Sequence, residues 1–193
     1  MQTIDALLER RSAKTLTAPA PDDGALELLL ECAARAPDHG RLRPWRFIVI
    51  RGAARARLGE LMAEQLQRKL PEASAESLER ERQKALRAPL IIVVAAVCRA
   101  AAKVPAIEQV LAAGAAAQNI MLAAPALGFG AMWKTGDAAY DDTVKVALGL
   151  AAADSIIGFL YLGTAPADGL PPPVRTPWQD RVSFWGQEGG PTA

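Results

Sequence analysis

Four short clusters of polar residues stand out against an apolar background. Each contains a cation and lies at an expected element end or in a loop, where sites are usually built. The clusters are Arg10–Arg11–Ser12, Arg35 with His39, the basic loop of Arg41, Arg43 and Arg46 around Pro44 and Trp45, and Trp133–Lys134–Thr135 between Gly130 and Gly136. Arginine presents a planar fork of donors that suits phosphate, and serine adds one short donor.

Each cluster also has an explanation that needs no ligand. Arg10 and Arg11 can interact favourably with the C-terminal end of the first helix, and chemistry alone favours this interpretation. His39 can be a loop residue that caps a backbone carbonyl, which is again the better interpretation of that residue by itself. Residues 133–136 can form an ordinary turn.

The chain lacks the patterns of several common enzyme classes. It has no P-loop, no GxGxxG after the first expected strand, no HExxH and no GxSxG. His39 is the single histidine, so a serine hydrolase triad or a His-rich metal site would depend on one imidazole. A reaction on this chain would therefore rely on a cofactor, with the protein supplying binding and electrostatics.

The composition predicts one globular domain over residues 1–193. A hydrophobic fraction of 51% and a net charge of +1 are ordinary for such a domain and give no reason to expect nucleic acid. Cys32 and Cys98 form no redox or metal motif, so we expect buried thiols in a reducing compartment. We see no signal peptide, and the apolar run at 90–97 is too short to span a bilayer. A cytoplasmic protein without a membrane partner is expected.

Hydrophobic periodicity predicts helices and strands in alternation. Helices are expected at 3–11, 25–36, 53–87 with a break near Pro71, 106–128 with Pro125 in its last turn and Gly128 as its C-cap, and 141–150. Strands are expected at 45–50, 90–97 and 156–164, with a strand or turn at 130–136. The strand at 90–97 has no polar alternation and should be central. The pattern predicts an α+β or α/β fold with a helix-covered sheet.

Two segments are unusual within this pattern. Residues 53–87 are rich in charge and poor in large apolar residues, which indicates a solvated face or a mobile helical excursion. Residues 167–193 form an extended C-terminal tail that is rich in Pro and Gly but carries Trp178, Phe184 and Trp185. A solvated tail has little use for aromatic residues, so we expect it to pack against something.

The ordered set of motifs is similar to the nitroreductase family, and closest to its small, minimal members. The motifs are RRS at 10–12, RAPDH at 35–39, PWRF at 44–47, WKTG at 133–136 and GFLYLGTAP at 158–166. They cover the chain from about residue 3 to residue 166. No single motif is specific, but the ordered set is.

This resemblance implies an FMN-dependent oxidoreductase with the nitroreductase fold, a central mixed sheet covered by helices. It implies an intertwined homodimer with two FMN sites at the subunit interface. The flavin would be reduced by NAD(P)H and reoxidised by nitro compounds or similar small-molecule electron acceptors. No catalytic side chain is then required, because the flavin carries the chemistry, and positive charge near its pyrimidine edge would stabilise the reduced form.

The resemblance also assigns residues. Those implied to contact FMN are Arg10, Arg11, Ser12, Arg35, His39, Trp133, Lys134 and Thr135. In each implied site, Trp133, Lys134 and Thr135 come from one chain, and Arg35 and His39 come from the other. Those implied to border the path of the nicotinamide are Ala123, Ala124, Pro125, Ala126, Leu127 and Gly128. The Ala-rich helix around Gly114 would be the dimer core, since small residues permit close packing.

The chain departs from the family pattern at four positions. Lys134 and Thr135 stand where a close relative has arginine and serine, which keeps the charge but loses the fork. Pro125 lies in the implied nicotinamide path, and Arg43 favours anionic substrates. Two alternatives remain open: a flavin-binding or carrier dimer without reductase activity, and a different FMN-dependent reductase or dehydrogenase.

Overall fold

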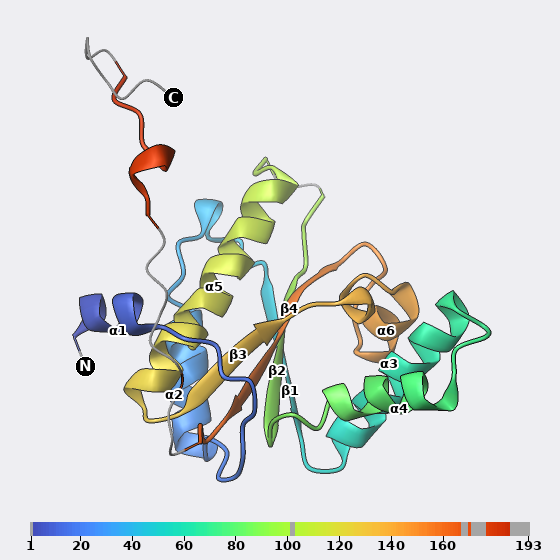
Figure 1. Ribbon diagram of the computed structural model, residues 1–193. Helices are drawn as coiled ribbons and strands as arrows, with labels where there is room; N and C mark the ends of the chain where they lie inside the picture. The colour runs from blue at the N-terminus through green and yellow to red at the C-terminus, as the bar shows by residue number, and fades with distance from the viewer. Residues whose placement is uncertain (1, 101–102, 167–169, 171–176, 186–193) are drawn as a thin grey trace.

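A four-stranded sheet covered by helices on both faces forms the body of the protein (Figure 1). The computed structural model describes residues 2–100, 103–166, 170 and 177–185. The strands are β1 (Trp45–Arg51), β2 (Leu90–Ala96), β3 (Gly130–Lys134) and β4 (Ser155–Gly163). The α-helices are α1 (Thr3–Glu9), α2 (Asp23–Ala33), α3 (Ala54–Lys69), α4 (Ala75–Lys84), α5 (Ala106–Ala126) and α6 (Asp142–Ala147). Three short 3-10 turns are η1 (His39–Arg41), η2 (Asp137–Ala139) and η3 (Gln179–Arg181).

The strand order is β1-β2-β4-β3, which places β2 and β4 at the centre. Every residue of β2 is buried, as its unbroken apolar sequence predicts. All three pairings are antiparallel. The described strands therefore form an antiparallel sheet where a mixed sheet was expected, while the α+β class itself is confirmed. The strand at 130–136 is real but ends at Lys134.

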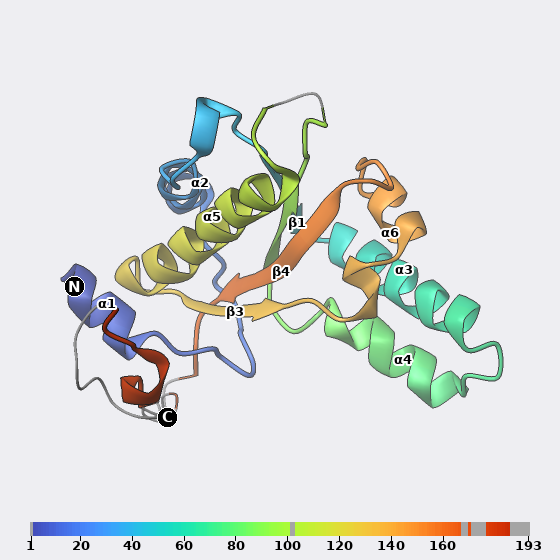
Figure 2. The same cartoon turned by 90° about the horizontal axis from the view of Figure 1, so that it is seen from above.

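Alternate residues of the central strands serve two separate cores. Ile91 and Val93 face a core that also contains Met62 of α3, and Leu90 and Ile92 face a core that contains Ile120 of α5. Figures 1 and 2 show α2 and α5 on one face of the sheet and α3, α4 and α6 on the other. The period-2 geometry of a strand explains how one apolar run supplies both layers.

The C-terminal end of α5 is closed by a Schellman motif. Gly128 has φ of +85°, the Phe129 N–H donates to Ala124 O at 2.9 Å, and the Gly128 N–H donates to Pro125 O at 3.0 Å. The predicted C-cap glycine is thus confirmed. Pro125 lies one residue before the helix ends at Ala126, where its missing N–H interrupts little of the helix.

Residues 53–87 form an ordered helical pair that is part of the fold. α3 buries Leu58, Met62 and Ala63 against the sheet, whereas α4 has no fully buried residue and packs on α3. At Gly59 the helices approach so closely that a Cβ would lie 2.6 Å from the Arg82 carbonyl oxygen. The charged character predicted a solvated face, and α4 supplies it.

The two ends of the described chain leave apolar residues uncovered. α1 has no buried residue, and its Ile4 and Leu8 are more than 60% exposed. In Figure 1 the short η3 stands away from the body, and Trp178, Phe184 and Trp185 are all exposed. None of the three is buried by the described residues, and most of the tail lies outside them, so packing of the tail stays a prediction.

Two further features follow from the described residues. Cys32 and Cys98 are free and half-buried, where fully buried thiols were expected. Among the described helices, none combines the length and the apolar character that crossing a bilayer requires.

Candidate functional site

The Arg10–Ser12 cluster lies along the open edge of β3. α1 ends at Glu9, so Arg10 occupies its C-cap position and the cluster continues as extended chain. The next residue fixes its course, because the Ala13 N–H donates to Ala131 O at 3.0 Å. The Leu16 N–H then donates to Arg87 O at 3.1 Å. Residues 10–16 therefore run from the start of β3 to the loop that precedes β2.

A cavity of about 300 Å³ opens beside this cluster. Arg10 and Arg11 line it together with Pro125 and Gly128 at the end of α5, and Thr164 closes it beyond β4. Among the described residues the Arg10 guanidinium has a single partner, Ser12 Oγ at the long distance of 3.5 Å, and Ser12 is exposed. Arg11 donates a hydrogen bond to the Leu170 carbonyl oxygen. The Arg10 guanidinium and the Ser12 hydroxyl are not held by strong hydrogen bonds to described residues, so both can donate to a phosphate. These residues therefore fit FMN.

The structure also places part of the implied nicotinamide path at this cavity. Pro125 and Gly128 contribute to the same lining as the two arginines. Ala124 is fully buried in the core and is unable to contact a ligand without rearrangement. Within residues 123–128, the exposed residues therefore lie at the C-terminal end of α5.

Trp133 is held rigidly at the far end of β3. Its Nε1 donates to the Ile157 carbonyl oxygen at 3.1 Å, across β4. Gly158 makes room for the ring, since a Cβ there would lie 2.2 Å from Trp133 Nε1. The indole therefore fixes the direction of Lys134 and Thr135, which leave β3 toward solvent.

A second cavity, of about 280 Å³, lies where Lys134 and Thr135 leave the sheet. Its polar lining also includes Lys84 at the end of α4, Arg87 in the following loop and Tyr161 of β4, together with the carboxylates of Glu81 and Asp137. Lys84, Arg87 and Tyr161 belong to none of the four polar clusters seen in the sequence. Arg87 precedes the buried strand β2, and its carbonyl oxygen accepts a hydrogen bond from the Leu16 N–H. This contact between distant parts of the sequence is visible only in the folded chain.

Burial raises the pKa of Tyr161 to about 12, although the nearby charge of Arg87 acts in the opposite direction. An unfolded chain releases this proton near pH 10, so the unfolded state binds fewer protons between pH 10 and 12 and stability falls there as pH rises. We expect wild type to lose about 1 kcal/mol more of its unfolding free energy between pH 9 and pH 11 than Tyr161→Phe. Urea unfolding at both pH values measures this, and an equal loss in the two proteins would disprove it.

The second cluster lies elsewhere, at the N-terminal end of α5. His39 Nδ1 is 2.6 Å from Glu108 Oε2, so its partner is a carboxylate and not the backbone carbonyl that the ligand-free interpretation predicted. The Arg35 N–H donates to Cys32 O at 3.2 Å, but its guanidinium has no hydrogen bond or ion pair to another described residue. It lines an open surface hollow with Arg43 and Trp45.

The basic loop between these residues is strained. Arg41 and Arg43 adopt φ of +53° and +49°, a left-handed conformation that is uncommon for residues with a side chain. Asp38 Oδ2 accepts the Arg43 N–H at 2.6 Å and holds the loop in place. Arg46 instead donates to the Gly149 carbonyl oxygen at 2.7 Å, and so has a structural role.

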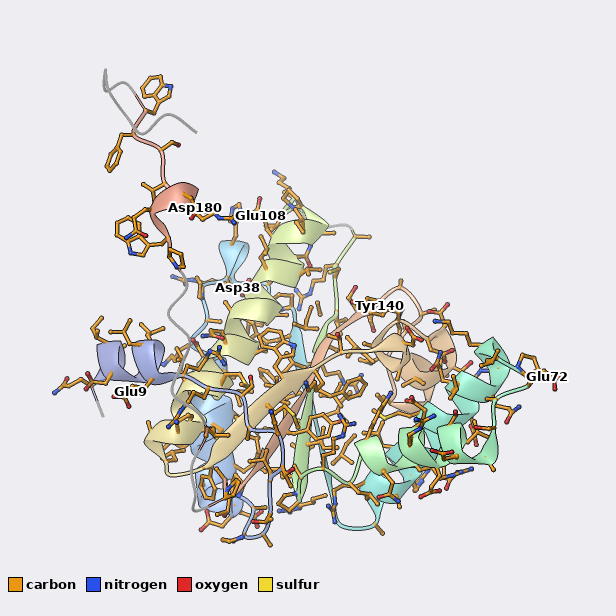
Figure 3. All side chains as sticks on the ribbon, viewed as in Figure 1. Glu9, Asp38, Glu72, Glu108, Tyr140 and Asp180 are labelled. Atoms are coloured by element: carbon orange, nitrogen blue, oxygen red, sulfur yellow. The ribbon has the colours of Figure 1, made fainter. Side chains whose placement is uncertain are left out.

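The structure thus brings the first and fourth clusters to one edge and leaves the second apart. His39 contacts Glu108 near the start of α5, whereas Arg10 shares a cavity with Pro125 near its end. Seventeen residues of helix correspond to about 25 Å. In Figure 3 the labelled Glu9, next to Arg10, and Glu108 lie apart on the molecule. One phosphate is unable to contact both clusters of a single chain.

Comparison with known families decides which proteins share this arrangement. The nitroreductase family model matches residues 7–164, a range that includes all four clusters. The chain belongs to the nitroreductase family. Its curated relatives in that family include the protein named "Putative NAD(P)H nitroreductase YdjA" from Escherichia coli strain K12, 39% identical over 165 residues. The match covers 85% of this chain and 88% of that protein.

Solved structures of the family share its fold. A nitroreductase-like family protein from Bacillus cereus superposes with a TM-score of 0.82 at 25% identity, covering 97% of both chains. A nitroreductase from Desulfovibrio desulfuricans, solved in complex with FMN, superposes with a TM-score of 0.73 at 28% identity, covering 99% of both chains. The family and the fold expected from the motifs are therefore confirmed.

Proposed function

We propose that this protein is an FMN-dependent oxidoreductase whose flavin is reduced by NAD(P)H and reoxidised by nitro compounds or similar small acceptors. The observation that carries the proposal is the 39% identity to an NAD(P)H nitroreductase homologue over most of the chain. The FMN complex of the Desulfovibrio relative supports the cofactor. The donors along β3 fit a phosphorylated ligand.

The proposed FMN site extends along the edge of β3. Arg10, Arg11 and Ser12 supply donors for the phosphate and nearby polar atoms, and Trp133–Thr135 bound the site at the far end of the strand. FMN supplies the hydride and electron chemistry when bound, which explains why no catalytic triad is required. The chain's own task is to hold, orient and electrostatically tune the cofactor.

A homodimer would explain the separated second cluster. His39 is about 25 Å of helix away from Arg10 in its own chain, so it would reach an FMN only in a partner's site, and Arg35 would accompany it. The strained loop at Arg41 and Arg43 supports a role for this segment, because such strain concentrates at functional sites. Each site would then draw on both chains.

The exposed stripe on α5 is the surface we propose for dimer contact. Ile107 and Leu111 are 61% and 64% exposed and lie one helical turn apart. A Cβ built at Gly114 meets nothing within 4 Å, so the stripe continues as open surface where a second backbone can approach. Uncovered apolar residues in such a row mark an interaction surface.

Leu111→Glu is expected to shift the protein from dimer toward monomer, because it buries a charge in the proposed contact. Light scattering with FMN present measures the mass. Val146→Glu is the matched control, since Val146 is similarly exposed on α6 and lies on the opposite face of the sheet. A monomer mass for wild type with flavin bound would refute the dimer.

Three finer assignments belong to this proposal. Residues 123–128 border the nicotinamide path, with Pro125 and Gly128 at the cavity that Arg10 lines. Arg43 adds positive charge on an open face and favours anionic substrates. The free thiols of Cys32 and Cys98 suit the reducing conditions of the cytoplasm.

Steady-state oxidation of NADH and NADPH, with and without a nitroaromatic acceptor, tests the proposed reaction. We expect acceptor-dependent oxidation by the FMN-loaded protein and none without flavin. Bound flavin that neither nucleotide reduces would instead support a carrier dimer. Reduction by NAD(P)H without turnover of nitro compounds would favour a different FMN-dependent reductase or dehydrogenase on the same site.

A further inference from the structure

The second cavity carries positive charge that the described protein does not compensate. Lys84 is paired with Glu81, and Asp137 is paired with Lys69 at 2.6 Å. The side chains of Arg87 and Lys134 have no hydrogen bond or ion pair to any described residue. Two cations are therefore left over after the two carboxylates of the lining have been counted.

Tyr161 adds a neutral donor to the same lining. Its side chain is 2% exposed, yet its hydroxyl makes no hydrogen bond to a described residue. No buried side-chain oxygen or nitrogen in the described part of the chain lacks a partner. The hydroxyl must therefore open into the cavity that Tyr161 lines. Its raised pKa keeps it protonated, so it is available as a donor.

We propose that Arg87, Lys134 and the Tyr161 hydroxyl together bind a negatively charged oxygen group of a small molecule. A guanidinium, an ammonium and a hydroxyl can all donate, and together they select an anionic, acceptor-only group such as a carboxylate or a phosphate. Met62 and Ala138 supply an apolar wall for the remainder of the ligand. At about 280 Å³ the cavity suits a small substituted aromatic group.

Two molecules can provide such an oxygen group. Both are taken from the proposed function, on which this inference therefore rests. The cavity adjoins Lys134 and Thr135, which we assign to FMN. The oxygen group therefore belongs either to FMN itself or to the electron acceptor that follows it. Both sources require the same chemistry of Arg87 and Tyr161.

Arg87→Gln and Tyr161→Phe test the site, because the first removes the positive charge and the guanidinium fork and the second removes only the hydroxyl. Arg57→Gln and Tyr140→Phe are matched controls at exposed positions outside the cavity. In the FMN-loaded protein we would measure KM for 4-nitrobenzoate and for nitrobenzene, which differ only in the carboxylate. In the flavin-free protein we would measure the Kd of FMN and, by calorimetry, of 4-nitrobenzoate.

If the group belongs to the acceptor, Arg87→Gln raises KM for 4-nitrobenzoate at least about tenfold and Tyr161→Phe about threefold, with nitrobenzene unchanged. If it belongs to FMN, the same variants raise the Kd of FMN by these factors and leave the ratio of the KM values for 4-nitrobenzoate and nitrobenzene unchanged. Variants that match their controls in every measurement would overturn the inference.

Failure of the proposed function is distinguishable from failure of this site. A wild-type protein that does not bind FMN refutes the proposed cofactor, whichever residues line the second cavity. Calorimetry with 4-nitrobenzoate needs no flavin, so in that case it decides on the site alone. If the wild type binds 4-nitrobenzoate and Arg87→Gln weakens that binding, the proposed site is supported. If the wild type does not bind 4-nitrobenzoate, the proposed site is rejected.

Discussion

Arg10→Ala is expected to weaken FMN binding by about 10- to 150-fold, which corresponds to about 1.5–3 kcal/mol for a lost charge-assisted contact. Arg10 lines the cavity beside the end of α5, and its one side-chain contact to a described residue is the 3.5 Å contact to Ser12. Its guanidinium can therefore turn to a phosphate without breaking a strong bond. Titration of the flavin-free protein, followed by FMN fluorescence, measures the change.

Arg57→Ala is the matched control, because Arg57 is exposed on α3 and lines neither cavity. The same titration separates two roles for Arg10. If Arg10 only compensates the dipole of α1, its loss lowers stability by about 0.3–1 kcal/mol and leaves FMN affinity at the control value. That outcome would remove Arg10 from the site.

Phe159→Ala is expected to lower the free energy of unfolding by about 3–5 kcal/mol. Phe159 is completely buried at the centre of β4 and packs with Val93, Met132 and Tyr161 in one core. Its removal leaves a cavity that the two neighbouring strands are unable to close. Since domains are stable by only about 5–15 kcal/mol, urea unfolding should show a large shift in midpoint.

The control for this variant is Phe184→Ala, the same substitution at an exposed position. We expect it to change the unfolding free energy by less than about 0.5 kcal/mol. A loss for Phe159→Ala as small as the one expected for Phe184→Ala would show that Phe159 contributes little to the core. Retained secondary structure in the folded Phe159→Ala protein should be verified by circular dichroism before the values are compared.

Much of the fold followed from local patterns. The unbroken apolar run of β2 predicted a central strand, and Gly128 predicted the end of α5, because backbone geometry leaves few alternatives at a left-handed position. Strand direction was less accessible. The antiparallel pairing depends on how connections cross the sheet, and hydrophobic periodicity contains no information about that.

The candidate site divides in the same way. Arg10–Ser12 and Trp133–Thr135 were found as polar clusters at element ends, and the fold places both along β3. Arg87 and Tyr161 were missed because one looks like a surface charge and the other like a core residue in an apolar strand. Only the tertiary structure shows that both line one cavity. The partner of His39 was wrong for a similar reason, since Glu108 is distant in sequence.

The visible spectrum of the purified protein, before and after addition of NADH or NADPH under anaerobic conditions, tests the central claim most directly. The account predicts an FMN spectrum, present as purified or restored by incubation with FMN, that bleaches when one of the nucleotides is added. A protein that stays colourless after incubation with FMN would contradict the cofactor, and a flavin spectrum that neither nucleotide bleaches would contradict the reaction.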